Sequence, residues 1–269
     1  MSREEINQYR CFVGHFGSGF FNLLDFPVLG IAMLRDPFEI AISALYYARK
    51  MYLRSGIPAM SEKRKQFLIE KGIIASSEMP GFDATIARVL ENGDLLQMLN
   101  NPWLARVIEN RQTLYLGYDV DINPASASPE SFLNWSRNTD NKLDFFFVNK
   151  LACGFDVTSV IAKAESRLEQ MDVIGIVENF GQSVQMLCDT LGIVAPRSLP
   201  KENIAPERNV HQIIAYRESG IPAEVAKRID ELTEIDRHIY EYGFSLFLKR
   251  AKRLSGKSFF YGRKVANWQ

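Results

Sequence analysis

A junction between a predicted strand and a predicted helix constrains the fold of this chain more than any other feature. An apolar strand is predicted over residues 28–34, and it stops at Arg35. A helix is predicted to begin at once, because Asp36 can cap it, Pro37 suits its first turn and Glu39 can complete a capping box. A strand that leads directly into a helix favours an α/β fold, in which helices cover parallel strands.

The same junction places a cationic side chain beside a helix N-terminus, where free N–H groups and the helix dipole favour an anion. Ser43 lies two turns into the predicted helix, on the same face as Asp36. Arg35 would supply charge and a planar fork, and Ser43 a neutral hydroxyl donor. The pattern predicts that Arg35 and Ser43 bind the same phosphate group. The alternative is a plain strand–helix junction whose arginine makes a surface ion pair.

The Arg-Asp-Pro run that begins at Arg35, with Ser43 eight positions after the arginine, resembles a sulfotransferase motif. The motif is the 3'-phosphate-binding motif of enzymes that use 3'-phosphoadenosine 5'-phosphosulfate (PAPS) as sulfuryl donor. The residues that follow the serine resemble the branch that includes the glycan 2-O-sulfotransferases: Tyr46, Tyr47 and Arg49. The resemblance implies PAPS as cosubstrate, with Arg35 and Ser43 on its 3'-phosphate, and a carbohydrate or other hydroxyl acceptor.

A predicted strand over residues 10–13 breaks into a glycine-rich loop at His15. In the same family a histidine at a strand end, roughly twenty residues before the Arg-Asp-Pro run, is the catalytic base. An imidazole suits that task, because its unperturbed pKa of about 6.5 lies close to the operating pH. The resemblance therefore implies that His15 is the base, and the alternative is a loop histidine with satisfied hydrogen bonds. His238 lies among residues of helical periodicity, which indicates a structural role.

Residues 172–192 resemble the family's late strand and helix. The matched positions are Gly175, Glu178, Phe180, Ser183 and Leu187. The pattern predicts a buried five-residue strand, a cap near Glu178 or Asn179, and an amphipathic helix. The predicted apolar stripe of that helix consists of Phe180, Val184, Leu187 and Leu191.

Three further segments carry the resemblance. Asn209, within residues 207–211, matches a segment near the loop that closes over the adenosine, which implies that Asn209 binds the nucleotide. Asp236 and Tyr240 match an Asp-x-x-x-Tyr pattern in the final helix, where Ile239, Phe244 and Phe247 follow helical spacing. Residues 110–113, Asn-Arg-Gln-Thr, resemble a run that precedes an extended segment in bacterial members, and no role is assigned to it.

The chain departs from the family in one respect. Members begin with a strand, a P-loop-like turn that holds the 5'-phosphosulfate, and a helix. No such motif occurs here. The nearest match, at Gly256 and Lys257, lacks the first glycine of the motif and follows a predicted helix rather than a strand. The resemblance therefore implies the fold without its first strand and P-loop. Two alternatives to an enzyme stay open: a non-catalytic remnant that binds a 3'-phosphonucleotide or a glycan, and an unrelated α/β binding domain.

The predicted architecture is a three-layer αβα domain over residues 1–269, with a central parallel sheet of the P-loop-NTPase-like sulfotransferase type. Residues 57–150 are predicted to be a helical and loop insertion that shapes the acceptor site, with helices at 82–92 and 94–109, the second interrupted by Pro102. A helix at 157–170 is predicted to lead into the strand at 172. The hydrophobic fraction of 46% is ample for a core.

The composition of the chain argues against some classes of partner. The 32 basic and 32 acidic residues balance, which argues against a nucleic-acid partner. The three cysteines lack metal-ligand spacing, so no metal is expected, and no membrane span is expected because no stretch of about 18 apolar residues occurs. We expect a cytoplasmic protein; the alternative is the lumenal part of a Golgi-type enzyme. A missing first strand would leave a sheet edge through which the chain could form a homodimer.

Overall fold

The structure is a computed structural model that describes residues 28–55, 66, 69, 82–101, 104–105, 108–117, 156–198 and 220–255. Arg35 and Ser43 lie within this part of the chain. His15 and Asn209 lie outside the described residues, as do the predicted strand at 10–13 and most of the predicted insertion.

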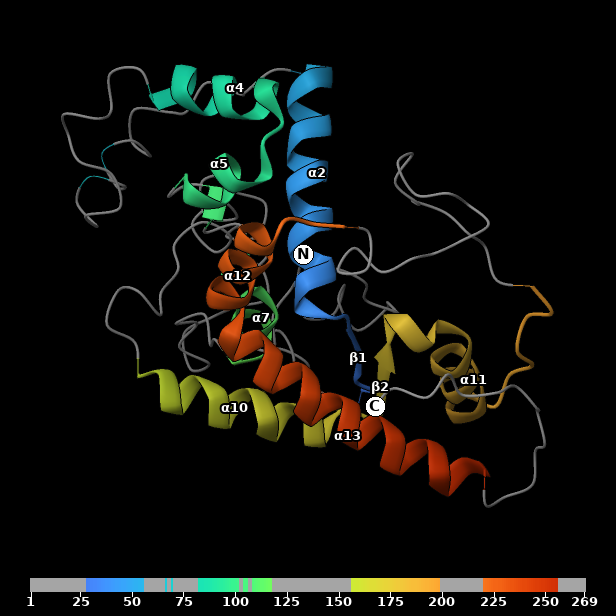
Figure 1. The fold of residues 1–269 in the computed structure, drawn as a ribbon. Helices are drawn as coiled ribbons and strands as arrows, with labels where there is room; N and C mark the ends of the chain where they lie inside the picture. The colour runs from blue at the N-terminus through green and yellow to red at the C-terminus, as the bar shows by residue number, and fades with distance from the viewer. Residues whose placement is uncertain are drawn as a thin grey trace.

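Two short parallel strands form the sheet in the described part of the chain, β1 (Ile31–Leu34) and β2 (Val173–Ile176). Ile31 pairs with Val173 and Leu34 with Ile176, so the carboxyl ends of the two strands lie side by side. β1 begins later than the predicted residue 28. Just before it, Gly30 donates its N–H to the Asp172 side chain, and its carbonyl accepts the N–H groups of Asp172 and Val173 at the start of the ladder. The parallel pairing confirms the α/β class in a mainly helical protein (Figure 1).

Helices make up most of the described chain. They are α2 (Pro37–Ser55), α4 (Phe82–Asn92), α5 (Leu95–Asn100), α7 (Arg111–Gly117), α10 (Val157–Gln170), the 3-10 helix η2 (Val177–Asn179), α11 (Phe180–Leu191), α12 (Ala223–Leu232) and α13 (Glu234–Ser255). The bounds of α4 and α10 confirm the sequence prediction. The segment 94–109 is interrupted as expected, because α5 ends at Asn100. The resemblance of residues 110–113 implied that an extended segment follows them, but residues 111–117 form a helix, α7.

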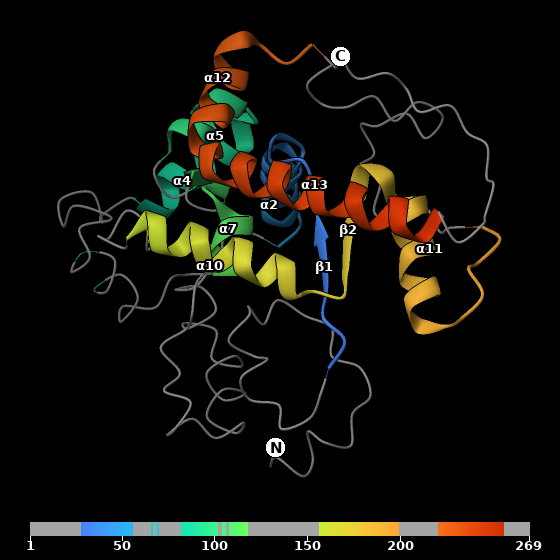
Figure 2. The ribbon, with the colours of Figure 1, turned by 90° about the horizontal axis from the view of Figure 1, so that it is seen from below.

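The buried apolar side chains of the described residues form two clusters. One surrounds α2 and contains residues of α2, α4, α5 and α12. The other surrounds the sheet and contains residues of both strands, α10, α11 and α13. Viewed from below, α13 crosses the two strands and extends toward α11 (Figure 2). A Cβ at Gly243 would lie 2.2 Å from Leu34 Cδ1, so this glycine lets α13 approach β1 closely.

The predicted apolar stripe of α11 is wrong at its two ends, whereas Leu187 packs against the core around the sheet. Phe180 is 43% exposed and Leu191 is 48% exposed, whereas Ser183, Met186 and Cys188 are buried. The hydroxyl of Ser183 accepts a hydrogen bond from the Ile176 N–H and donates to the carbonyls of Ile176, at the end of β2, and Asn179, at the end of η2. The helix therefore turns its serine toward the sheet, and the two ends of the predicted stripe face outward.

Candidate functional site

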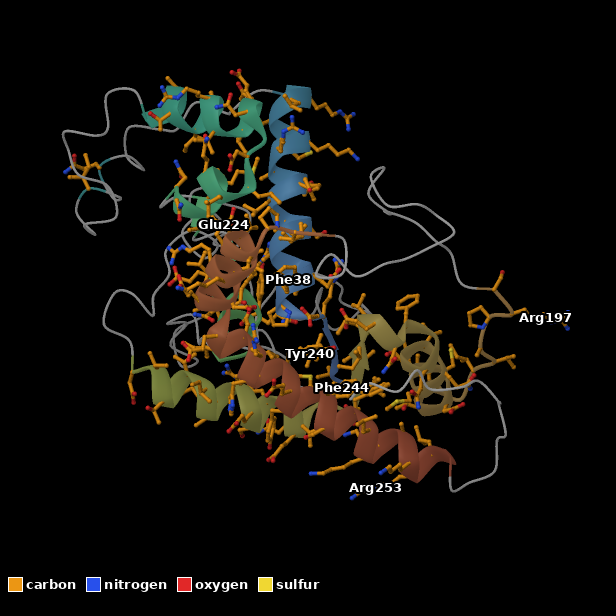
Figure 3. All side chains as sticks on the ribbon, viewed as in Figure 1. Phe38, Arg197, Glu224, Tyr240, Phe244 and Arg253 are labelled. Atoms are coloured by element: carbon orange, nitrogen blue, oxygen red, sulfur yellow. The ribbon has the colours of Figure 1, made fainter. Side chains whose placement is uncertain are left out.

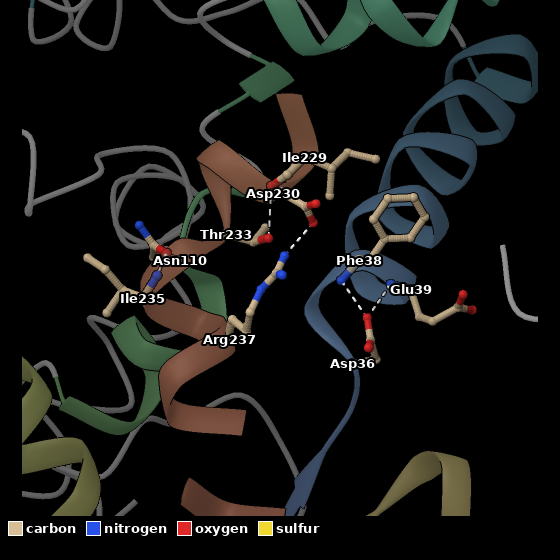
Figure 4. A network of polar contacts seen from close by, with 9 residues as sticks. All are labelled: Asp36, Phe38, Glu39, Asn110, Ile229, Asp230, Thr233, Ile235 and Arg237. Atoms are coloured by element: carbon tan, nitrogen blue, oxygen red, sulfur yellow. Dashed lines mark hydrogen bonds and ion pairs between the residues drawn. The ribbon is translucent and has the colours of Figure 1, made fainter. Parts of the chain in front are cut away.

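The candidate site is the junction between β1 and α2. β1 ends at Leu34, Arg35 follows, and α2 begins at Pro37, as the sequence predicted. Asp36 caps the helix: its Oδ1 accepts the N–H of Phe38 at 2.8 Å and that of Glu39 at 3.3 Å (Figure 4). A strand end, a cation and a helix N-terminus therefore meet within a few residues.

The capping box predicted with Glu39 takes a different form. The backbone N–H of Asp36 donates to Glu178 Oε1 at 3.0 Å, and Glu178 follows β2. The other oxygen of Glu178 accepts the Tyr240 hydroxyl at 3.1 Å. Tyr240 belongs to α13, and Figure 3 shows it beside the N-terminal end of α2, where Phe38 is labelled. The carboxylate that closes the cap therefore comes from a distant segment.

Glu39 instead faces the arginine that precedes it by one helical turn. Arg35 Nη2 lies 3.7 Å from Glu39 Oε2, and the two side chains are 24% and 9% exposed. This distance is longer than the 2.7–2.9 Å of a typical charge-assisted hydrogen bond. Arg35 is thus paired loosely with a carboxylate of its own chain, and part of its side chain remains accessible.

Burial governs the electrostatics of Glu178. Although the residue as a whole is exposed, desolvation of its carboxylate raises its pKa, which the hydrogen bonds from Asp36 N–H and Tyr240 oppose. The charge of Asp36 adds to the increase. Burial, followed by the charge of Glu178, also raises the pKa of the Tyr240 phenol. Glu178 therefore becomes protonated at a higher pH than an ordinary glutamate.

The side chain of Gln112 holds the backbone of Arg35. The N–H of Arg35 donates to Gln112 Oε1 at 3.0 Å, and Gln112 Nε2 donates to the Arg35 carbonyl at 2.8 Å. Gln112 belongs to α7 and is 8% exposed. Its amide thus satisfies both backbone polar groups of the residue that follows the last ladder pair of β1.

Asp236 ties α7 to α13. It is 1% exposed and accepts three hydrogen bonds, from the Gln112 N–H at 3.0 Å and from the Thr113 N–H and Oγ1 at 2.7 Å each. Burial raises the pKa of Asp236 to about 6, although these hydrogen bonds oppose the increase. Asn110 adds a contact in the other direction, because its Oδ1 accepts the N–H groups of Ile235 and Asp236 at the start of α13. Figure 4 shows Asn110 beside Ile235.

Ser43 lies in α2 and is partly buried. Its place on the face of Asp36 follows from helical geometry, and its hydroxyl has no hydrogen-bond partner among the described residues. Arg49, which matched the family continuation, caps the end of α4 by donating from Nε to the Leu90 carbonyl at 3.0 Å. His238 forms a 2.7 Å contact with Glu165 of α10, in agreement with its expected structural role.

The structure therefore places Arg35 and Ser43 on one strand–helix unit, and sequence reasoning missed the residues that support it. The Asn-Arg-Gln-Thr resemblance included Gln112, and the Asp-x-x-x-Tyr pattern included Asp236 and Tyr240. Neither pattern indicated which residues these side chains contact. The described residues contain no group of three or more His, Cys, Asp or Glu side chains that could hold a metal ion. No helix in the same part of the chain is long and apolar enough to cross a membrane.

Comparisons with family models, with curated proteins and with solved structures found no match for this chain.

Proposed function

We propose that this chain binds a 3'-phosphorylated adenine nucleotide at the β1–α2 junction and transfers the sulfuryl group of PAPS to a hydroxyl, preferably on a carbohydrate. The observation that carries the proposal is the position of Arg35. It follows a parallel strand directly and precedes the N-terminus of a helix on which Ser43 lies two turns further along. Ligands of α/β proteins bind at the carboxyl ends of the parallel strands, and a helix N-terminus there favours an anion.

Phosphate binding would begin with an exchange of partners at Arg35. The Arg35 side chain is 24% exposed and its Nη2 lies 3.7 Å from Glu39 Oε2, so a phosphate can take the place of the carboxylate. A guanidinium binds two phosphate oxygens in a planar fork, which a single distant carboxylate oxygen does not match. The Ser43 hydroxyl, which has no partner among the described residues, would donate to a third oxygen of the same group.

In the transfer step, the acceptor hydroxyl oxygen attacks the sulfur of PAPS. The bond between the sulfur and the bridging oxygen breaks, and 3'-phosphoadenosine 5'-phosphate leaves. His15 would accept the hydroxyl proton, as the sequence resemblance implies. Positioning and charge neutralisation supply most of the catalysis in the related phosphoryl transfers, so a firmly held 3'-phosphate contributes by fixing the donor.

The first experiment compares nucleotides that differ in the 3'-phosphate. Calorimetry should show tighter binding of 3'-phosphoadenosine 5'-phosphate than of AMP. Because charge-assisted hydrogen bonds contribute about 1.5–3 kcal/mol each, Arg35→Ala should weaken binding of the 3'-phosphorylated nucleotide by about tenfold to a hundredfold. Arg54→Ala, at the exposed far end of the same helix, removes the same charge and is the matched control. Equal affinity of the unaltered chain for the two nucleotides would overturn the proposal.

A second experiment separates transfer from binding alone. The chain is incubated with labelled PAPS and mixed glycan acceptors, and turnover is compared with that of His15→Ala. A positioned general base contributes about 10²–10⁴-fold, so the variant should lose activity on that scale while its nucleotide affinity stays unchanged. Selective binding of the 3'-phosphorylated nucleotide with no transfer to any acceptor would favour the non-catalytic alternative.

A further inference from the structure

The geometry points to Gln112 as a positioning residue that fixes Arg35 for recognition of the 3'-phosphate. The side-chain amide of Gln112 binds the backbone of Arg35 at the junction, through a pair of hydrogen bonds of 3.0 and 2.8 Å. The inference rests on the proposed function, because it concerns Arg35 as a phosphate ligand. It assigns a role to the Asn-Arg-Gln-Thr run, which the sequence left without one.

The amide of Gln112 takes the place of a neighbouring strand. The ladder between β1 and β2 ends at the pair Leu34 and Ile176, so Arg35 is the first residue beyond it. A primary amide offers one acceptor and a donor in the geometry of a peptide group, and it binds the N–H and the carbonyl of Arg35 together. Gln112 is 8% exposed and the two bonds are partly buried, so an unpaired backbone group at this place would be costly.

The backbone at Gln112 is itself held by a contact with α13. Its N–H donates to Asp236, and the next residue, Thr113, donates to the same carboxylate through both its N–H and its hydroxyl. Asp236 belongs to the 22-residue helix α13, whose start is in turn capped by Asn110. A movement of the α7 backbone at Gln112, from which its side chain extends, would therefore have to disturb the contact between α7 and α13.

The helix α13 supports both sides of the junction. Asp236 and Tyr240 are one helical turn apart and lie on the same face of α13. Asp236 acts through Gln112 on the backbone of Arg35, and Tyr240 acts through Glu178 on the N–H of Asp36. The peptide group between Arg35 and Asp36 is thus held at both of its ends by side chains from other elements.

This support matters for binding because a flexible arginine loses conformational freedom when it binds a phosphate. Ligand sites retain specificity when neighbouring groups hold their side chains close to the productive geometry. With its backbone fixed by Gln112, the Arg35 side chain extends from one defined position between β1 and α2. Release of the backbone should therefore reduce the gain in affinity that the 3'-phosphate provides, and leave the contribution of the rest of the nucleotide unchanged.

The test compares Gln112→Met with Thr113→Val. Methionine has a similar length and cannot form either hydrogen bond to Arg35. Valine removes the hydroxyl bond to Asp236 in the same turn of α7 and leaves the Gln112 amide in place. For both variants we would measure affinity for 3'-phosphoadenosine 5'-phosphate and for AMP, the midpoint of thermal unfolding, and the NMR order parameter of the Arg35 Nε–H bond.

We expect Gln112→Met to weaken binding of the 3'-phosphorylated nucleotide by about fivefold to thirtyfold, with no change for AMP and a lower order parameter at Arg35. Thr113→Val should lower the unfolding midpoint without changing the ratio of the two affinities. Equal losses for both nucleotides in both variants would show that Gln112 is merely structural and would overturn the inference. So would an unchanged affinity ratio and order parameter in Gln112→Met.

Failure of the proposed function can be distinguished from failure of the positioning role of Gln112. If the proposed function is wrong, the unaltered chain binds both nucleotides equally, and the order parameter alone decides whether Gln112 positions Arg35. A decrease in Gln112→Met but not in Thr113→Val would support the positioning role. An unchanged value in Gln112→Met would overturn it.

Discussion

The backbone N–H of Asp36 donates to Glu178 across 142 positions of the chain, at 3.0 Å. This contact joins the segments that follow the two strands, because Asp36 comes after β1 and Glu178 after β2. It also brings a second carboxylate to the N-terminus of α2, beside the cap formed by Asp36. An anion that binds at this junction therefore meets negative charge as well as Arg35.

Nucleotide affinity should consequently depend on the protonation of Glu178. Its pKa is raised, so on acidification it loses its charge earlier than an ordinary glutamate does. We expect affinity for the 3'-phosphorylated nucleotide to rise as the pH falls from 7 toward 5, and Glu178→Gln to flatten part of that rise. The phosphate also titrates near pH 6, so the quantity to compare is the difference between variant and unaltered chain.

Glu224→Gln is the control for that comparison, because Glu224 is an exposed residue of the first turn of α12. Its affinity should follow that of the unaltered chain at every pH. Identical pH profiles for Glu178→Gln and Glu224→Gln would refute the role of Glu178.

Removal of the carboxylate that faces Arg35 should strengthen phosphate binding. Glu39→Gln abolishes the ion pair at 3.7 Å, so the guanidinium no longer exchanges one anion for another. Because partly exposed ion pairs contribute about 0–1 kcal/mol, the affinity should rise by about twofold to fivefold in calorimetry. Glu231→Gln, which removes the exposed pair with Arg228, should leave the affinity unchanged. A weaker affinity in Glu39→Gln would indicate that Glu39 orients Arg35 rather than competing with the ligand.

The hydroxyl of Ser43 should matter for binding and not for folding. A neutral hydrogen bond contributes about 0.5–1.5 kcal/mol, so Ser43→Ala should lower the affinity by about twofold to tenfold. The unfolding midpoint should stay the same or rise slightly, because alanine is the better helix former. Ser183→Ala is the opposite case, since that hydroxyl bonds to Ile176 and Asn179 and its loss should lower the midpoint. If Ser43→Ala destabilises the chain without affecting the nucleotide, Ser43 is not a ligand.

Sequence reasoning succeeded where the cause lies within a few residues. The start of α2 depends on Asp36 and Pro37, and the break after α4 depends on Gly93, whose φ of 71° suits a glycine. Such local rules located β1, β2 and the helices that adjoin them. They also placed Arg35 at a strand end and Ser43 on the helix that follows.

The supporting contacts could not be predicted in the same way. Gln112 and Arg35 are 77 positions apart, and Asp236 and Thr113 are 123 positions apart. Polar side chains of this kind have no periodicity that names a partner, so only the fold brings them together. The apolar pattern of α11 misled for a related reason, because the face toward the sheet is fixed by the hydrogen bonds of Ser183.

The buried carboxylate of Asp236 should make the stability of the chain depend on pH. Its pKa is about 6 in the folded chain, against an ordinary value of 3.8. The folded state therefore keeps this proton more tightly than the unfolded state. The contribution of Asp236 is fully present below about pH 4 and is lost as the pH rises through 6. At about 1.4 kcal/mol for each pKa unit, the loss amounts to about 3 kcal/mol.

Asp236→Asn lacks this titration, so the free energy of unfolding should fall less steeply between pH 4 and pH 7 in the variant than in the unaltered chain. Denaturant unfolding at several pH values measures the difference. The variant loses stability at every pH, because its amide N–H₂ replaces an oxygen that accepts the Gln112 N–H, and so the slope rather than the absolute value carries the test. Asp230→Asn, which removes the partner of Arg237 on the surface, is the control. Parallel slopes for Asp236→Asn and the unaltered chain would mean that Asp236 stays ionised in the fold, stabilised by its three donors.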